Sequence, residues 1–572
     1  MAFASLIRAI AVMFLVVLGC GPAATPRTTD APPASTGRPG RTLVTAIRVE
    51  PTTLASRLGQ GGGATLSTTR RMFNAYLVLF DQRGNAQPYL AAELPQLNGP
   101  SWTVFPDGRM ETTYKLRPNL VWHDGTPLTA EDFVFAWRVY ASPALGVASA
   151  PPTSLMDGVV APDPLTVTIR WNGQHAGAGV LTEQFPPLPR HLLESPFETV
   201  ATDAFAAHPY WTTQFVGAGP FRVDRWEPGA YIEASAFSRH VLGAPKIERV
   251  RLIFISDSNT ALANLLAGEV HYAPEDSAIR FQQALTVERE WAPVNGGSIL
   301  IKPDLWRSTF VQFHPERLAT PGLVDVRVRK ALALTMDKEG LNQALFEGQG
   351  QEIMADVPFI PKTTGYYAAI EPAVTKYPFD PSRAQTLLTG AGYTRAADGV
   401  WASPTAGRLS FGLLTGATSQ NETEMSILAA GWRQVGFEVQ ESVMPAAQAQ
   451  DGQARSMFPG LSIISIPLGE ATLATTGTVG ISAPENRWTG RNRGSWSNPE
   501  FDRFADTFTR TLDQQERVQA VAQMVRIFSE ELPNISMYFN PTPTVHVAAL
   551  KGPQAVDPAA DISWNIHEWE FQ

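Results

Sequence analysis

The sequence predicts an α/β protein with more than one lobe, in which mixed sheets are flanked by helices. The chain has 572 residues, which exceeds the size at which a single hydrophobic core stops growing. Hydrophobic residues make up 44% of the chain and charged residues 17%, a composition typical of folded proteins. From residue 41 onward, short runs rich in β-branched residues alternate with amphipathic helical patterns, as in α/β lobes.

Residues 1–40 are expected to export and tether the protein. Arg8 is the only charged residue before a nearly apolar stretch at 9–18, which is the layout of a secretory signal. The segment from Val17 to Cys20 resembles the lipobox of bacterial lipoproteins, so we expect removal of residues 1–19 and lipidation of Cys20. An ordinary signal peptide with an incidental cysteine is the alternative. Residues 21–40 contain five Pro and no large apolar side chain, which predicts a flexible tether.

The charge and cysteine content exclude several classes of protein. The net charge of -9 is spread along the chain without a Lys/Arg-rich run, so no nucleic-acid partner is expected. Because Cys20 is the single cysteine, an intrachain disulfide or a cysteine-based metal cluster cannot form. After residue 40 no apolar segment reaches the length of a transmembrane helix, so this part is expected to be soluble and extracytoplasmic.

Strands and helices can be placed from local patterns. Residues 42–49 and 249–255 are rich in β-branched side chains and predict buried strands. Residues 114–116 and 121–122 flank a turn at 117–119, which predicts a β-hairpin. Thr129 and Asp132 form a variant capping box, and Phe133 begins the apolar stripe of the helix that follows. Later helices are expected to begin at Asp380-Pro381, before Met425, at Asn498-Pro499 and at Asp513.

No motif for catalysis is found in the sequence. A Gly-x-Ser-x-Gly elbow and a His-Glu-x-x-His helix are both absent, and the nine histidines are scattered. Gly59 to Gly63 is not followed by the Gly-Lys-Ser/Thr that completes a phosphate-binding loop. His123-Asp124 precedes Gly125 in a pattern typical of a turn. We therefore expect a protein that is not an enzyme, with no metal site and no cofactor.

Residues 114–135 carry a resemblance to a known family. They read Tyr-Lys-Leu-Arg-Pro-Asn-Leu-Val-Trp-His-Asp-Gly-Thr-Pro-Leu-Thr-Ala-Glu-Asp-Phe-Val-Phe. This segment resembles the signature of the family 5 solute-binding proteins of bacterial ABC importers, which include dipeptide-, oligopeptide- and nickel-binding members. Further similar segments follow in the family's order, at 216–221, 261–269, 325–332, 380–393 and 497–502.

The resemblance implies a two-lobed periplasmic-binding-protein fold with an extra subdomain in lobe I. The expected order is a signal peptide at 1–19 and a lipidated, flexible tether at 20–40. Lobe I is expected at 41–300, with the extra subdomain at about 81–205. Lobe II then covers 301–540, and residues 541–572 return to lobe I.

The same resemblance implies a receptor that captures a peptide or similar small solute by hinge closure. The receptor would deliver its solute to ABC permease subunits, act as a monomer and stay at the extracytoplasmic side of a bacterial membrane through its lipid anchor. Oligosaccharides, opine-like conjugates and metal chelates are alternative solutes. An envelope sensor or chaperone-like protein on the same fold is the alternative function, and a secreted hydrolase is less favoured.

Candidate ligand-binding residues come from loops that face the cleft in the family. Peptide-binding relatives place a carboxylate near the segment aligned with Leu461–Leu468, but this stretch contains no acid and Glu470 comes just after it. Aromatic side chains there could stack on a ligand and an arginine could pair with a carboxylate. The candidates are Arg57, Gln60, Tyr366, Glu470, Arg487, Trp488 and Trp496.

Overall fold

The structure is a computed structural model that describes residues 42–56, 66–145, 152–275, 277–445, 448, 451–484, 488 and 490–572. These residues fall within one compact unit, Arg41–Gln572. The predicted signal peptide, Cys20 and the tether lie outside the described residues. In the ranges given above, every helix is too short or too polar to cross a bilayer.

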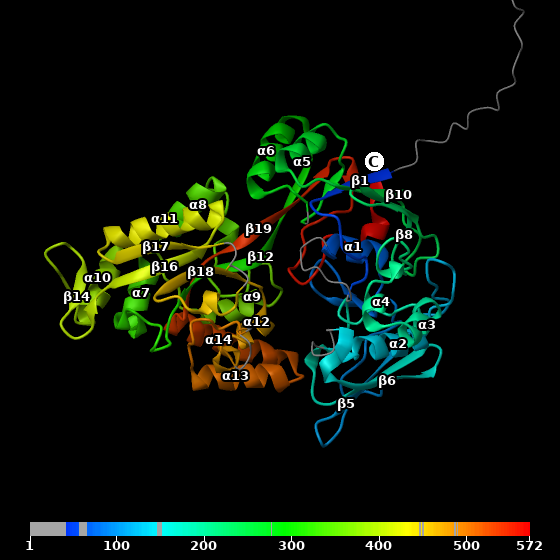
Figure 1. The fold of residues 1–572 in the computed structure, drawn as a ribbon, viewed down its shortest axis with the longest axis horizontal. Coiled ribbons are helices and arrows are strands. Elements are labelled where there is room, and N and C mark those ends of the chain that lie inside the picture. The colour runs from blue at the N-terminus through cyan, green and yellow to red at the C-terminus, as the bar shows by residue number, and fades with distance from the viewer. Residues whose placement is uncertain are drawn as a thin grey trace, which may run out of the picture. The chain divides into compact units, whose positions relative to one another are not determined.

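A ten-stranded mixed sheet organises the molecule (Figure 1). Its two central strands, β12 (Gly297–Val311) and β19 (Asn534–Val547), are antiparallel and have 15 and 14 residues. On one side of this pair lie β18 (Leu461–Ile466), β16 (Ser410–Gly416) and β17 (Glu438–Met444). The other side has β11 (Tyr272–Ala273), β1 (Thr42–Ile47), β10 (Arg249–Phe254), β9 (Tyr231–Ala236) and β8 (Phe221–Glu227).

A second sheet has four antiparallel strands, and the strand pairing near it differs from one sequence prediction. Its order is β4 (Trp102–Val104), β5 (Met110–Lys115), β7 (Thr166–Trp171) and β6 (Met156–Asp163). The hairpin predicted between 114–116 and 121–122 is wrong, because Leu116 bridges Ala91 and Val121 bridges Pro127. The Arg117 side chain donates a hydrogen bond to the backbone oxygen of Tyr89 at 2.9 Å. The predicted turn is therefore tied to a segment upstream of both strands.

The helices predicted from capping residues are confirmed. In α2 (Ala130–Tyr140) the backbone N–H of Thr129 donates to the Asp132 carboxylate at 2.8 Å. The side chains of Asp380, Asn498 and Asp513 each accept from a backbone N–H of the first helical turn that follows. The corresponding helices are α10 (Pro381–Gly390), α13 (Pro499–Arg510) and α14 (Gln514–Glu531). The helix predicted around Met425 is α11 (Ser419–Gln434).

The remaining elements are shorter. The other helices are α1 (Leu66–Phe73), α3 (Arg190–Thr199), α4 (Thr202–Ala206), α5 (Ser258–Leu266), α6 (Phe281–Trp291), α7 (Val326–Leu334), α8 (Lys338–Phe346), α9 (Tyr367–Ile370) and α12 (Glu470–Ala474). Small sheets are formed by β2 (Val78–Phe80) with β3 (Ala86–Pro88), by β13 (Thr394–Arg395), β14 (Trp401–Ser403) and β15 (Gly407–Arg408), and by β20 (Leu550–Lys551) with β21 (Glu570–Phe571).

Two large hydrophobic cores form within the unit. The first core takes side chains from Leu43 to Tyr272 and again from Leu550 to Trp569. The second core takes side chains from Phe281 to Phe539. Burial of this much apolar surface in two separate clusters supplies the main driving force for two folded bodies. The α/β class with a mixed sheet is confirmed, and the domain boundaries given above stay predictions.

Candidate functional site

A cavity of about 590 Å³ lies between segments that belong to the two cores. Its first-core side comes from the turn after β2 and from residues 557–559 of the C-terminal segment. Its second-core side comes from residues 360–366, from 468–470 at the start of α12, and from Gln514 at the start of α14. This volume is within the range of small-molecule binding sites. We call it the shared cavity.

Glu470 and Tyr366 meet in the shared cavity. The Tyr366 hydroxyl donates a hydrogen bond to Glu470 Oε2 at 2.5 Å. Burial, and then the negative charge of Glu470, raise the pKa of Tyr366 well above its ordinary value, so the phenol remains a donor. Gly469 has a φ of +97°, a conformation that suits glycine, and this turn directs the chain from β18 into α12.

Asp557 provides a second carboxylate from the first-core side. Its Oδ2 accepts a hydrogen bond from the backbone N–H of Gly365 at 3.1 Å, which links the two sides of the cavity. Its Oδ1 accepts from the N–H of Ala559 at 2.9 Å. Burial raises the pKa of Asp557, because desolvation disfavours the charged carboxylate.

The charge of the shared cavity is mainly negative. Among the described residues, neither Glu470 nor Asp557 forms a salt bridge. Arg83 is the one cation in the lining and is exposed. Both carboxylates are half-buried and accept hydrogen bonds, and Arg517 and Lys302 act on them electrostatically without a direct ion pair. A positively charged group of a ligand would supply the direct partner that each carboxylate lacks.

A more open hollow of about 440 Å³ continues from the shared cavity along α14. The two spaces share Tyr366 and Gln514 in their linings. The hollow is bordered mainly by amide and small apolar side chains of α14, including Val518 and Ala522. A solute longer than the shared cavity therefore has room to extend along this helix.

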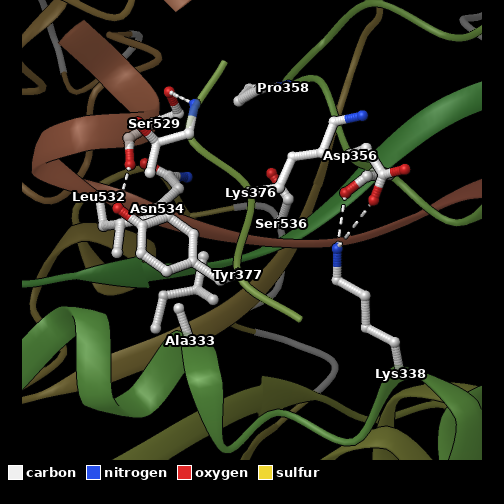
Figure 2. A pocket seen from close by; sticks show the side chains of 13 residues that line it. Ala333, Lys338, Asp356, Pro358, Lys376, Tyr377, Ser529, Leu532, Asn534 and Ser536 are labelled. Carbon is white, nitrogen blue, oxygen red and sulfur yellow. Dashed lines mark hydrogen bonds and ion pairs between the residues drawn. The ribbon is translucent and has the colours of Figure 1, made fainter. Parts of the chain in front are cut away.

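A smaller cavity of about 30 Å³ lies within the second core (Figure 2). Lys338 lies at its edge and donates to the backbone oxygen of Ala355 at 2.8 Å, with Asp356 Oδ1 at 3.9 Å. Burial lowers the pKa of Lys338. Such a volume accommodates about one water molecule, so this cavity is too small for a solute.

The structure brings two of the predicted site residues together and separates others. Tyr366 and Glu470 both line the shared cavity. Trp496 does not: it is 3% exposed, packs against Phe501 and donates its indole N–H to Glu531 at 2.8 Å. Its predicted stacking on a ligand is therefore not retained.

The other aromatic candidate also lies away from this lining. Trp488 is half-buried, with the Arg317 guanidinium carbon 5.1 Å from its ring centre. Arg57, Gln60 and Arg487 lie outside the described residues. Sequence reasoning missed Asp557, whose only local signal is the turn-forming Asp-Pro pair.

Within the part of the chain that the structure describes, no group of three or more His, Cys, Asp or Glu side chains is arranged to hold a metal ion.

Comparison with known proteins identifies the family. The model of bacterial extracellular solute-binding proteins, family 5 Middle, matches residues 95–469. The chain belongs to this family. Oligopeptide-binding protein AppA of Bacillus subtilis is 22% identical over 544 residues, which cover 94% of this chain and 93% of AppA. A Brucella ovis protein named for an ABC transporter is 24% identical over 297 residues, so the match spans about half of each chain, 52% and 51%.

A solved structure supports the fold. The periplasmic oligopeptide-binding protein of an oligopeptide ABC transporter from Thermotoga maritima superimposes with a TM-score of 0.74. The match covers 93% of this chain and 99% of that chain at 18% identity. The likeness confirms the predicted two-lobed binding-protein fold.

Proposed function

We propose that this family 5 protein is the solute-binding receptor of an ABC importer and that it binds a peptide with a free amino terminus. The family and the names of its oligopeptide-binding relatives support this function. The observation that carries the proposal is Glu470, which lines the shared cavity and is held there by Tyr366. A peptide ammonium group paired with this carboxylate forms charge-assisted hydrogen bonds.

Glu470 supplies the carboxylate that the segment 461–468 lacks. Asp557 adds a second acceptor from the opposite side of the cavity, at the point where it already accepts from Gly365. A ligand that contacts both sides is bound more tightly when they are close together. Differential affinity of this kind shifts the equilibrium toward a closed state.

The remaining parts of the proposal follow from this receptor role. The closed form delivers its peptide to membrane permease subunits, and the chain itself works as a monomer without a cofactor. A lipid on Cys20 holds the protein at the extracytoplasmic side of the membrane. Each CH₂ group of an acyl chain that is buried in the membrane contributes about 0.8 kcal/mol of binding free energy.

The test compares tetra-alanine with N-acetyl-tetra-alanine, which lacks the ammonium group. Binding to the mature chain is followed by calorimetry and by tryptophan fluorescence. Tetra-alanine is expected to bind about ten- to 100-fold more tightly, the equivalent of a charge-assisted bond. The substitution Glu470→Gln removes this preference.

Glu352→Gln is the matched control, because the Glu352 side chain is 87% exposed and lies outside the cavity lining. This variant keeps the preference for the free amine. Equal affinities of the two peptides for the wild-type protein, or no binding of either, would contradict the proposal.

A further inference from the structure

A second cavity, of about 200 Å³, lies where β16 and β18 separate. The two parallel strands pair only at Leu413 with Leu461 and at Leu414 with Ser462. The chain leaves β16 through α11 to β17 on one side, whereas β18 lies on the other side. In open α/β sheets, ligands bind at such switch points, beyond the carboxyl ends of the strands. We call this space the fork cavity.

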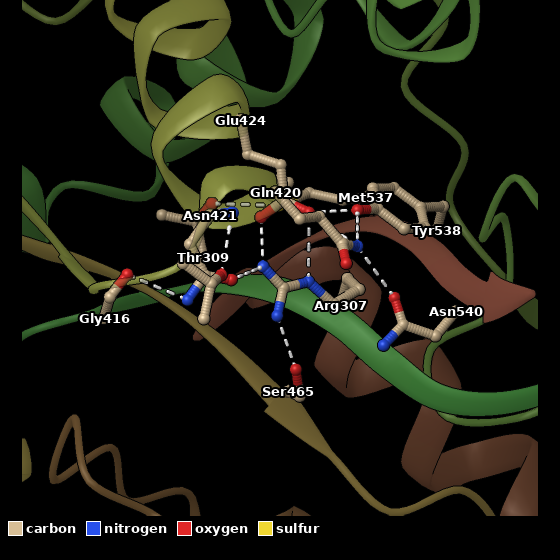
Figure 3. A network of polar contacts seen from close by, with 11 residues as sticks. Arg307, Thr309, Gly416, Gln420, Asn421, Glu424, Ser465, Met537, Tyr538 and Asn540 are labelled. Carbon is tan, nitrogen blue, oxygen red and sulfur yellow. Dashed lines mark hydrogen bonds and ion pairs between the residues drawn. The ribbon is translucent and has the colours of Figure 1, made fainter. Parts of the chain in front are cut away.

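The fork cavity has two arginines in its lining and, among the described residues that line it, no carboxylate. The guanidinium of Arg307, on β12, already has hydrogen-bond and ion-pair partners within the protein (Figure 3). Its guanidinium contacts the buried Glu424 carboxylate through Nε and Nη2, Asn421 Oδ1 through Nη2 at 2.7 Å, and Ser465 Oγ through Nη1 at 2.5 Å. Glu424 also accepts from the Tyr538 hydroxyl. The charge of Arg307 is therefore neutralised within the protein.

Arg455 is different, because its guanidinium has no hydrogen-bond or ion-pair partner among the described residues. It is half-buried, and burial lowers its pKa. Arg493 lies close enough to Arg455 for the two charges to interact. Burial, and then Arg455 and Arg491, lower the pKa of Arg493 to about 10, and its buried Nε has no hydrogen-bond partner among the described residues. Because these arginines have no carboxylate beside them in the described lining of the fork cavity, an anion would stabilise their positive charges.

A buried hydroxyl also lies at the fork cavity without a partner. Thr415, in its lining, is 1% exposed, and its Oγ1 has no hydrogen-bond partner in the described part of the chain. Leaving a buried polar atom unpaired is unfavourable, so such an atom commonly marks a place for a ligand or water. Ser462, which is 5% exposed, adds another hydroxyl to the same lining.

We propose that the fork cavity binds a carboxylate group of the transported solute, through the free guanidinium of Arg455 and the hydroxyl of Thr415. This inference rests on the proposed receptor function and names a second chemical requirement of the solute. Ser465 in the fork cavity and Glu470 in the shared cavity are five residues apart in one segment. A chain of five extended residues spans at most about 17 Å. A short peptide, with a carboxylate and an ammonium group at its two ends, has a length within this limit.

The experiment uses the mature chain and two probes, tetra-alanine and tetra-alanine amide, which lacks the carboxylate. Wild-type protein is expected to bind the free acid about ten- to 100-fold more tightly than the amide. Arg455→Gln removes this difference, whereas Arg455→Lys keeps part of it because the positive charge remains. Arg383→Gln, on an exposed surface of α10, is the control with the same loss of charge and keeps the difference. A melting curve without ligand shows whether each variant is folded.

The failure of this inference can be separated from failure of the receptor function. If tetra-alanine and its amide bind equally well to the wild type, peptides bind but the fork cavity does not take the carboxylate, and the inference is overturned. If neither peptide binds, the thermal midpoint in succinate is compared with that in sodium chloride at equal ionic strength. A rise in succinate that Arg455→Gln abolishes and Arg383→Gln retains supports the carboxylate site. An equal rise in all three proteins, or no rise, overturns it.

Discussion

The shared cavity and the fork cavity are built from adjacent parts of one segment but differ in charge. Residues 468–470 give the shared cavity a carboxylate, and residues 462–465 give the fork cavity hydroxyl and apolar groups beside arginines. The shared cavity needs both cores, since Asp557 comes from the far side. The fork cavity is lined only by residues between Arg307 and Ser465, from the part of the chain that forms the second core. Movement between the two sides therefore alters the first site and leaves the second intact.

The largest effect is expected for Glu424→Gln, which would make the fork cavity more positive and so increase its difference in charge from the shared cavity. This change leaves the buried charge of Arg307 without its counter-charge, so the free energy of unfolding is expected to fall by about 3–5 kcal/mol. The affinity for N-acetyl-tetra-alanine, which has only a carboxylate, is expected to rise because Arg307 adds net positive charge. Denaturant unfolding and calorimetry measure the two effects.

Glu441→Gln is the comparison for this variant, because Glu441 forms a more exposed ion pair with Arg433 at 2.7 Å. Loss of such a pair is expected to cost less than about 1 kcal/mol. If the Glu424→Gln protein were as stable as this control, Arg307 would not be a buried charge that depends on Glu424 as its counter-charge.

A change of pH is expected to affect ligand binding at the shared cavity but not at the fork cavity, and this effect is smaller than that of Glu424→Gln. Because burial raises the pKa of Asp557, this carboxyl takes up a proton as the pH falls through that raised pKa. Its negative charge is then lost, and binding of tetra-alanine amide is expected to be weaker at pH 5 than at pH 7. Binding of N-acetyl-tetra-alanine at Arg455 stays constant, because a guanidinium remains charged over this range.

Asp557→Asn tests the assignment of the titrating group. The variant is expected to bind tetra-alanine amide with little dependence on pH, since its amide does not titrate. Calorimetry at both pH values gives the result, and a pH dependence equal to that of the wild type would assign the effect to another group.

The smallest effect is expected for Tyr366→Phe. This change removes the hydroxyl that donates to Glu470, a loss of about 1 kcal/mol, or about fivefold in the dissociation constant of tetra-alanine amide. N-acetyl-tetra-alanine is expected to bind unchanged. Tyr377→Phe is the matched control, since the Tyr377 hydroxyl donates to Ser529 O at 2.8 Å outside the shared cavity. Equal losses for both probes would mean that Tyr366 acts on the fold as a whole.

Local patterns in the sequence were sufficient for most helices. The pairing of Thr129 with Asp132 and the capping by Asp513 involve residues three apart, so the sequence alone contains both partners. The hairpin at 114–122 failed for the opposite reason. Which strand pairs with which is decided by distant segments, here by Ala91 and by β7.

In the candidate site, too, some features could be predicted from the sequence and others depend on contacts between distant segments. Tyr366 and Glu470 were predicted from the family resemblance, but their hydrogen bond joins residues 104 positions apart. Trp496 could not be assigned from sequence, because an indole ring suits a core as well as a ligand cleft. Only its packing on Phe501 and its bond to Glu531 place it in the core.

The class of fold, the family and the positions of the capped helices could be predicted without coordinates, because these depend on composition and on residues close together in the chain. Tertiary structure alone decided which charges share a cavity. Asp557 reaches Gly365 across 192 positions, and Arg455 has no counter-charge among the residues that the structure describes, while Arg307 is paired with Glu424. Electrostatic interactions depend on distance and burial in space, and neither can be read from separation along the chain.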